Sequence, residues 1–201
     1  MSNKNMKKTE KLLIDITFNL LYKKGFCATS LMDILKTAKI TKGAMYYHFT
    51  SKNELVLASM QYYLEYILQS HWIAPFEEND QPIEILIKQI NAYLEIYADA
   101  ESFLDIKHGC PLMNFVLDMS DKDEAFFSYL HSVYSRWQES VNKALQKAQE
   151  LNQTKTKFDS NDQALFIISS IEGSIGVAKA YNSLESLTKS FEVLTNYIRS
   201  L

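Results

Sequence analysis

The chain has 201 residues, of which 47% are hydrophobic, and a formal net charge of −3. Five glycines and three prolines are too few for a turn-rich β architecture, and two cysteines exclude a disulfide scaffold and favour a reducing cytoplasm. The sequence lacks a signal peptide, an apolar run of membrane-spanning length and metal-ligand spacing, so we expect no membrane association, no metal and no cofactor.

Helical periodicity runs along the whole chain and predicts an all-α fold of about nine or ten helices. The first four predicted helices begin near Thr9, Thr29 or Ser30, Thr41 and Ser51, and they end near Gly25, Thr37, His48 and His71. Ser51 and Glu54 have the spacing of a capping box, in which each side chain bonds the other residue's backbone N–H.

The rest of the chain predicts a loop at 72–81 followed by five more helices. These helices cover residues 83–99, the stretch after Pro111, 127–151, 164–181 and 184–201. The segment 164–181 is apolar nearly all round and should be buried on both sides. The last helix carries apolar residues at a strict spacing of three and four, like a coiled-coil seam. The two C-terminal helices, about 160–181 and 184–200, therefore predict a homodimer interface, with packing inside one chain as the alternative.

Charge is distributed unevenly along the chain. Residues 1–52 hold ten lysines and three acidic residues, a net charge of +7, whereas residues 53–201 carry a net charge of −10. Such an asymmetry indicates a basic head that meets a polyanion and an acidic body that does not.

The predicted third helix has the residue types that suit the major groove of DNA. Its first turn holds the small residues Gly43 and Ala44, which allow a close approach. Thr41 and Lys42 stand at its start, where backbone N–H groups attract phosphate. Tyrosines follow at positions 46 and 47 and can bond phosphate through their hydroxyl groups.

The stretch from Thr29 to Leu55 resembles the helix-turn-helix of TetR/AcrR-type transcriptional regulators. The positions that carry the resemblance are Thr29-Ser30, Ile34-Leu35, Ala38-Lys39-Ile40-Thr41, Lys42-Gly43, Tyr46, His48-Phe49 and Lys52-x-x-Leu55. The resemblance implies a two-fold dimer. It also implies a three-helix DNA-binding head, residues 1–52, and a larger helical body for ligand binding and dimerisation, residues 53–201.

The same resemblance implies which residues lie near double-stranded operator DNA. They are Thr29, Ser30, Lys39, Thr41, Lys42, Gly43, Ala44, Tyr46, Tyr47, His48 and Lys52. We expect most of them to bind phosphates, and Lys42, Ala44 and Tyr46 to read bases. Lys39 departs from the family pattern, which has glycine at that position in the turn. A positive φ at this position would cost about 1 kcal/mol with lysine.

Regulators of this type mostly release DNA when a small, often hydrophobic compound enters the body. Aromatic and neighbouring side chains that suit such a pocket are Tyr66, Tyr93, Phe103, Met113, Asn114, Trp137 and Phe166, although ordinary core packing is the alternative. Cys110 precedes Pro111 at a helix start, where the helix dipole and Lys107 would lower the pKa of its thiol. Cys110 is therefore a candidate sensor, with an inert packing cysteine as the alternative.

These features predict a bacterial DNA-binding transcriptional regulator, a repressor rather than an activator on the family resemblance alone. We expect it to leave its operator on binding a small hydrophobic inducer or on modification of Cys110. An alternative is a ligand-binding helical dimer of the same fold without specific DNA binding. An enzyme that uses Cys110 and His108 is disfavoured, because residues two apart at a helix start do not face each other.

Overall fold

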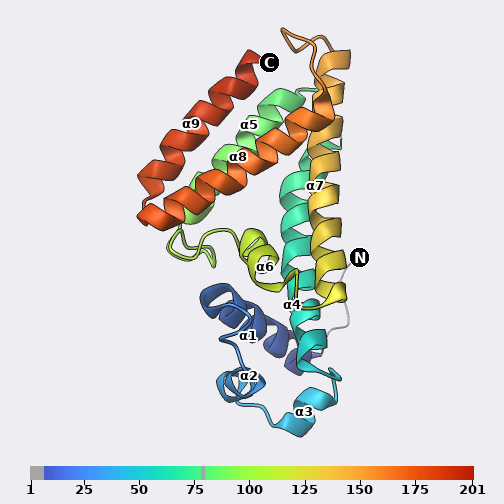
Figure 1. Ribbon diagram of the computed structural model, residues 1–201, viewed down its shortest axis with the longest axis vertical. Helices are drawn as coiled ribbons and strands as arrows, with labels where there is room; N and C mark the ends of the chain where they lie inside the picture. Colours follow the sequence, from blue (N-terminus) through green and yellow to red (C-terminus); the bar gives the residue numbers. More distant parts are fainter. Residues whose placement is uncertain (1–6, 78–79) are drawn as a thin grey trace. The chain divides into compact units, whose positions relative to one another are not determined.

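The protein is all-α, as predicted. The structure is a computed structural model that describes residues 7–77 and 80–201, and within these ranges it has nine α-helices and no strand (Figure 1). The chain divides into two compact units. One holds the residues up to Tyr66 together with Asn114–His131, and the other holds Ile67–Met113 and Ser132–Leu201.

The first unit contains the predicted DNA-binding head. Its helices are α1 (Lys8–Lys24), α2 (Leu31–Ala38), α3 (Lys42–Tyr46) and α4 (Lys52–Ile67). Helix α4 runs without a break past the predicted boundary at residue 52, and Leu55 on it is buried in the same core as α1 and α2. The compact unit is therefore larger than the head, and a functional division after residue 52 stays a prediction.

The helix starts show how local sequence builds this unit. Ser30 caps α2 and forms a capping box with Asp33, and Thr41 caps α3 by accepting a hydrogen bond from the Ala44 backbone N–H at 3.2 Å. The predicted Thr9 cap is wrong, because the Lys11 N–H already bonds the Lys7 carbonyl and α1 begins before Thr9.

The box predicted at the start of α4 forms only in part. Ser51 Oγ accepts from the Glu54 backbone N–H at 3.1 Å, but the Glu54 carboxylate accepts from the Thr50 backbone N–H at 2.6 Å. The Glu54 carboxylate therefore bonds the backbone N–H of the residue before Ser51 and not that of Ser51 itself. Threonine competes successfully for the carboxylate because its hydroxyl and its N–H both reach the same oxygen.

One apolar core holds α1 to α4 together. Its buried members are Leu13, Ile14, Ile34, Leu35, Ala38, Met45, Phe49 and Leu55. Each short helix contributes to this core, so none of them has to be stable alone. From α2 the buried residues are Ile34, Leu35 and Ala38, and Ile40 in the turn packs against the same core.

The second unit contains most of the helical body. Its helices are α5 (Pro82–Ala98), the start of α6 (Pro111–Met119), most of α7 (Glu124–Glu150), α8 (Ser160–Tyr181) and α9 (Leu184–Ser200). The loop predicted from Trp72 is wrong at its start, because a π-helical turn, Leu68–Ile73, and a 3₁₀ turn, Ala74–Phe76, continue the helix. Trp72 is buried there and packs against Trp137 with the two rings tilted by 42° and 4.8 Å between their centroids. Asn79, also predicted in this loop, lies outside the described residues.

Helix α9 packs against α5 and α8 inside one protomer. The stripe predicted as a dimer seam is already buried there, and its buried members are Leu187, Phe191, Leu194, Ile198 and Leu201. The stripe thus packs inside the protomer, against α5 and α8, which was the alternative for these residues. A homodimer interface through other faces of the two C-terminal helices stays a prediction.

Helix α8 is covered on one side only. Ile167, Ile171 and Ile175 are buried, whereas Leu165, Phe166 and Val177 are about half exposed. Among the described helices, α8 has the length and apolar composition of a membrane span, with a mean hydropathy of 1.2 over its most apolar window. A core helix that also buries an interface has the same composition.

The turn between α2 and α3 yields the first prediction. Lys39 ends α2 with φ 55°, a left-handed conformation that a side chain disfavours. We expect Lys39→Gly to raise the free energy of unfolding by roughly 0.5–1 kcal/mol, because glycine adopts this conformation without a steric cost. Urea unfolding at a fixed protomer concentration measures the change.

Lys36→Gly is the matched control, since Lys36 is also exposed but lies inside α2. There glycine should lower the free energy of unfolding by about 1 kcal/mol. A loss of stability in both variants would show that the left-handed turn is not strained.

Candidate nucleic-acid interface and effector site

Helix α3 and its flanks present one continuous exposed face. Met45 and Phe49 point into the core and are at most 5% exposed. The residues around them, Thr41, Lys42, Gly43, Ala44, Tyr46 and Tyr47, are all exposed. The burial of two side chains therefore decides which residues of this segment are free to meet a partner.

Gly43 lies in the middle of this face. A Cβ at this position would meet nothing within 4 Å, and its backbone is ordinary helix, so the fold itself does not require glycine here. A missing side chain at an open, exposed position instead lets a second molecule approach the helix backbone closely.

Lys7 and Tyr47 extend the face. The Lys7 ammonium donates to Tyr47 Oη at 3.0 Å and lies 4.6 Å from the centre of its ring. This hydrogen bond raises the pKa of Lys7 and lowers the pKa of Tyr47. The sequence reasoning missed Lys7 because it lies 40 residues away from Tyr47 and looks like part of a basic tail.

Three residues expected near DNA have internal partners instead. The Thr29 side chain is fully buried, and its hydroxyl donates to the Gly25 carbonyl at 2.7 Å. Lys52 donates to the Phe26 carbonyl at 3.2 Å and lies over the Phe26 ring, and partial burial lowers its pKa. His48 is largely buried, with Nδ1 4.0 Å from Glu10 Oε2. These side chains hold the head together, and for Thr29 a direct side-chain contact with DNA is excluded by burial.

A second group of polar and aromatic side chains lies inside the second unit. We call it the Glu172 cluster, and its members are Trp72, Tyr93, Cys110, Tyr134, Trp137 and Glu172. Glu172, on α8, is only 3% exposed. Its Oε1 accepts hydrogen bonds from Cys110 Sγ at 3.3 Å and from Tyr134 Oη at 3.0 Å. Burial raises the pKa of Glu172 to about 7.

Aromatic rings continue the cluster away from the carboxylate. Trp137 is 6.0 Å from Tyr134 and 4.8 Å from Trp72, measured between ring centroids. Trp72 Nε1 donates to Tyr93 Oη at 3.0 Å. These contacts join α5, α7 and the π-helical turn around one buried carboxylate.

The expectation that the Cys110 thiol has a lowered pKa is wrong. Burial and the neighbouring Glu172 carboxylate raise the pKa of Cys110 well above its ordinary value. The backbone N–H groups of Leu112 and Met113 favour the thiolate, as expected at a helix start, but their effect is smaller. A half-buried thiol that donates its proton to a carboxylate and has a raised pKa is a poor nucleophile.

The other predicted pocket residues divide between interior and surface. Tyr93 and Trp137 belong to the Glu172 cluster, and Met113 and Asn114 are half-buried on α6. More than a third of the surface of Tyr66, Phe103 and Phe166 is exposed. Sequence reasoning missed Trp72, Tyr134 and Glu172. The available signal was one carboxylate in the otherwise apolar segment 164–181.

Comparisons with known proteins agree with the resemblance of residues 29–55 to the helix-turn-helix of TetR/AcrR-type regulators. Residues 13–59 match the family model described as "Bacterial regulatory proteins, tetR family", and residues 87–194 match "Tetracyclin repressor-like, C-terminal domain". An uncharacterised HTH-type transcriptional regulator from the lacX 3′ region of Lactococcus lactis subsp. lactis is 30% identical over 94% of this chain and 93% of its own length.

Two further proteins are similar over different extents. The biofilm operon icaADBC HTH-type negative transcriptional regulator IcaR of Staphylococcus epidermidis is 33% identical over 63 residues, 29% of this chain and 34% of that protein. The crystal structure of a TetR-family transcriptional regulator from Cytophaga hutchinsonii covers 98% of both chains with a TM-score of 0.80 and 22% identity, which shows the same fold.

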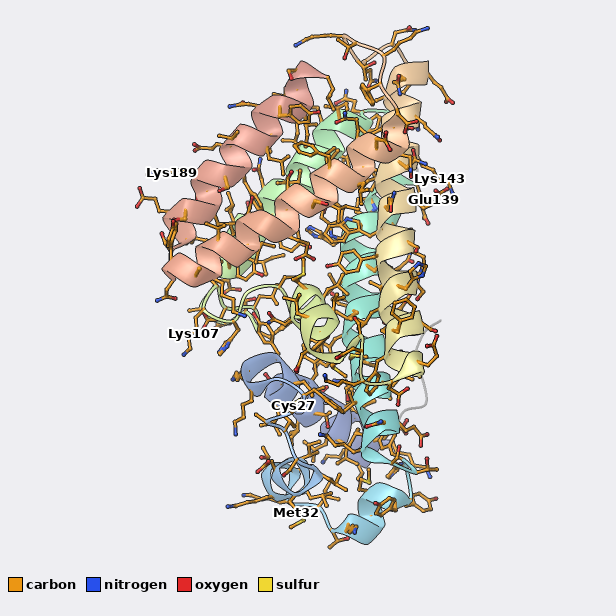
Figure 2. The ribbon with its side chains drawn as sticks, in the orientation of Figure 1. Cys27, Met32, Lys107, Glu139, Lys143 and Lys189 are labelled. Carbon is orange, nitrogen blue, oxygen red and sulfur yellow. The ribbon has the colours of Figure 1, made fainter. Side chains whose placement is uncertain are left out.

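The two cysteines yield a prediction of labelling rates. Cys27 is exposed in the turn after α1 (Figure 2), whereas the Cys110 thiol donates to Glu172 and has a raised pKa. We therefore expect a mild alkylating agent at pH 7.5 to modify Cys27 at least tenfold faster than Cys110. Mass spectrometry of peptides from the native protein gives both rates. Faster labelling of Cys110 would restore the thiol-sensor hypothesis.

Glu172 yields a prediction of pH dependence. Its pKa is about 7 in the folded protein and 4.5 as an ordinary carboxyl group. Below pH 4.5 the group is protonated in both states, so burial costs nothing. As the pH rises from 4.5 to 7, the unfolded chain gives up this proton first, and the folded state loses stability relative to it. The full loss above pH 7 is about 3 kcal/mol.

Urea unfolding at pH 5 and pH 8 tests this sign with Glu172→Gln. The stability difference between wild type and variant should shift by about 2–3 kcal/mol in favour of the variant at pH 8. Cys110 and Tyr134 have raised pKa values and stay neutral in this window, and His71 is common to both proteins. Glu139→Gln, which removes an exposed carboxylate paired with Lys143, should show no such shift (Figure 2).

Proposed function

The chain belongs to the TetR family of bacterial regulatory proteins and is a DNA-binding transcriptional regulator, and from this premise we propose that it is a repressor released from operator DNA by a small molecule. Members of the family bind operator DNA and act as dimers with small-molecule ligands. We also propose that it acts in the cytoplasm and has no catalytic activity.

The exposed face of α3 carries the DNA-binding part of the proposal. Lys42, Ala44 and Tyr46 stand on it without covering side chains and are our candidates for base contacts. Ser30, Lys39, Thr41, Gly43 and Tyr47 surround them, and Lys7 adds a cation on Tyr47. In this proposal Thr29, His48 and Lys52 support the face from inside.

Phosphate binding should supply most of the affinity. Residues 1–52 carry a net charge of +7, so association releases counterions and weakens steeply with salt. Tyr46 is 47% exposed and Tyr47 is 72% exposed, so both hydroxyl groups can reach a phosphate without rearrangement of the head.

The outer face of α8 is our candidate for the homodimer interface. It combines the half-exposed Leu165, Phe166 and Val177 with Gly173 and Gly176, at which a Cβ would meet nothing within 4 Å. Open glycines allow a second helix to approach closely, and an exposed apolar patch is a typical sign of an interface. Helix α9 would contribute its outer residues, such as Val193, and not the stripe that faces α5.

The Glu172 cluster is our candidate for the effector site, because it joins three helical segments through polar groups that a ligand can rearrange. The non-covalent route replaces the thiol route, since Cys110 lacks the properties of a reactive cysteine. Repression rather than activation rests on the similarity to IcaR, a negative regulator. The alternative, a helical dimer without specific DNA binding, is decided by the next experiment.

Fluorescence anisotropy with an operator tests the groove helix. The operator is selected from a random-sequence library with the wild-type protein. We expect Lys42→Ala and Tyr46→Ala to weaken operator binding at least tenfold, with the melting temperature and the dimer unchanged. Lys42→Ala should also reduce the slope of log affinity against log salt by about two, since a dimer loses two cations that face the DNA.

Lys143→Ala is the control, because Lys143 is an exposed lysine on α7 that pairs with Glu139 and lies outside the head (Figure 2). It should leave both affinity and salt slope unchanged. Failure of the library to yield any operator would favour the alternative function, and unchanged affinity in both α3 variants would remove α3 from the interface.

Sedimentation velocity tests the α8 interface. Val177→Arg places a charge on the outer face, and we expect the dimer dissociation constant to rise at least tenfold because the guanidinium would be desolvated against its symmetry mate. Met32→Arg is the control, since Met32 is 69% exposed on α2 (Figure 2). If the dimer dissociation constant of the Val177→Arg protein equals that of wild type, the outer face of α8 is not the dimer interface.

A further inference from the structure

The Glu172 carboxylate has one oxygen without a partner. Oε1 accepts two hydrogen bonds, but Oε2 is buried and has no hydrogen-bond partner among the described residues. A buried polar oxygen that has lost water without gaining a donor costs about 1–3 kcal/mol. In a core helix whose other buried residues are mostly aliphatic, such a cost has no benefit for folding.

In the part of the chain that the structure describes, no cation pairs with this carboxylate. Within residues 7–77 and 80–201, Glu172 makes no ion pair, and its two donors, Cys110 and Tyr134, are neutral groups. The half-buried imidazole of His71 donates to the Gln89 carbonyl at 2.8 Å, and desolvation lowers its pKa, so it does not supply a cation at neutral pH either. Hydrogen bonds therefore reach the Oε1 atom of this carboxylate but not its Oε2 atom.

Aromatic rings belong to the same cluster as the unpartnered oxygen of Glu172. The Tyr134 hydroxyl donates to Glu172, and the Tyr134 ring stacks on Trp137 at an interplanar angle of 27°. Trp137 Nε1 is a second buried polar atom of the cluster that has no hydrogen-bond partner among the described residues. Trp72 and Tyr93 continue this aromatic wall. Aromatic faces attract cations, and the attraction grows when both partners are removed from water.

We propose that the Glu172 cluster binds an organic cation, whose ammonium group donates to Glu172 Oε2 and whose apolar body lies against Tyr134 and the two tryptophans. This step deepens the proposed function, because such a ligand would be the inducer of the same effector site. The carboxylate supplies selectivity for charge, and the rings supply affinity for the apolar body.

Access and chemistry favour this ligand over a metal or an electrophile. Cys110 and Tyr134 are each partly exposed, so the cluster begins directly beneath the surface. Zinc binding would require a Cys110 thiolate, whereas the thiol here donates its proton to Glu172. Within the described residues there is also no group of three His, Cys, Asp or Glu side chains arranged to hold a metal ion.

Intrinsic fluorescence reports on this site directly, because the chain has two tryptophans and both belong to the cluster. The probes are benzylamine and 4-phenylbutylamine, each titrated beside its neutral counterpart, benzyl alcohol or 4-phenylbutan-1-ol. Wild-type protein should bind at least one amine saturably and at least tenfold more tightly than the matched alcohol.

Glu172→Gln should abolish that preference by weakening amine binding at least tenfold, with alcohol binding changed less than twofold. Glu139→Gln is the matched control and should keep the wild-type preference, since Glu139 is exposed on α7. Near-ultraviolet circular dichroism checks the fold of each variant. If Glu172→Gln does not fold, Glu172→Asp takes its place and should keep the preference for the amine with a lower affinity.

Three results would overturn the proposal: no saturable binding of either amine, equal affinity of amine and alcohol, or a preference that survives Glu172→Gln. The assay contains no DNA, so its outcome is independent of the operator experiment. Operator binding without amine binding would support the proposed DNA-binding function and contradict the proposed cation site. Amine binding without operator binding would support the cation site and contradict the proposed repressor function.

Discussion

The burial of Met45 and Phe49 is the constraint on which the DNA-binding surface depends. Helix α3 has five residues, too few for a helix to persist alone in water. It exists because Thr41 caps it and because these two side chains enter a core built from α1, α2 and α4. The same burial turns Lys42, Ala44 and Tyr46 outward. A local cap and a shared core thus produce a recognition surface from a segment with little helical stability of its own.

Helix α8 serves two purposes with one apolar sequence. Its inner face packs in the protomer and carries Glu172, and its outer face presents apolar and glycine positions. In our proposal these faces become the effector site and the dimer interface. A ligand at Glu172 would then act on the helix that also joins the two protomers, which offers a short physical connection between binding and the arrangement of the dimer.

Cys110 illustrates how two correct principles can oppose each other. The helix start does favour its thiolate through two backbone N–H groups, as the sequence indicates. Desolvation and a neighbouring carboxylate oppose that effect and exceed it. The neighbour is Glu172, 62 residues away in the chain. No local pattern around Cys110 contains that information.

The sequence by itself determined the all-α class, the cap at Thr41 and the positive charge of residues 1–52, and it left the cap of α2 open between Thr29 and Ser30. These properties depend on neighbours within four residues or on composition, so periodicity and capping rules reach them. Tertiary structure alone decided that the α9 stripe packs against α5 and α8 and that Lys52 bonds the Phe26 carbonyl. It also decided that Thr29 is buried and that Glu172 lies beside Cys110 and Tyr134. Each of these pairings joins segments distant in the chain, and a hydrophobic stripe or a buried polar group specifies that it needs a partner without specifying which one.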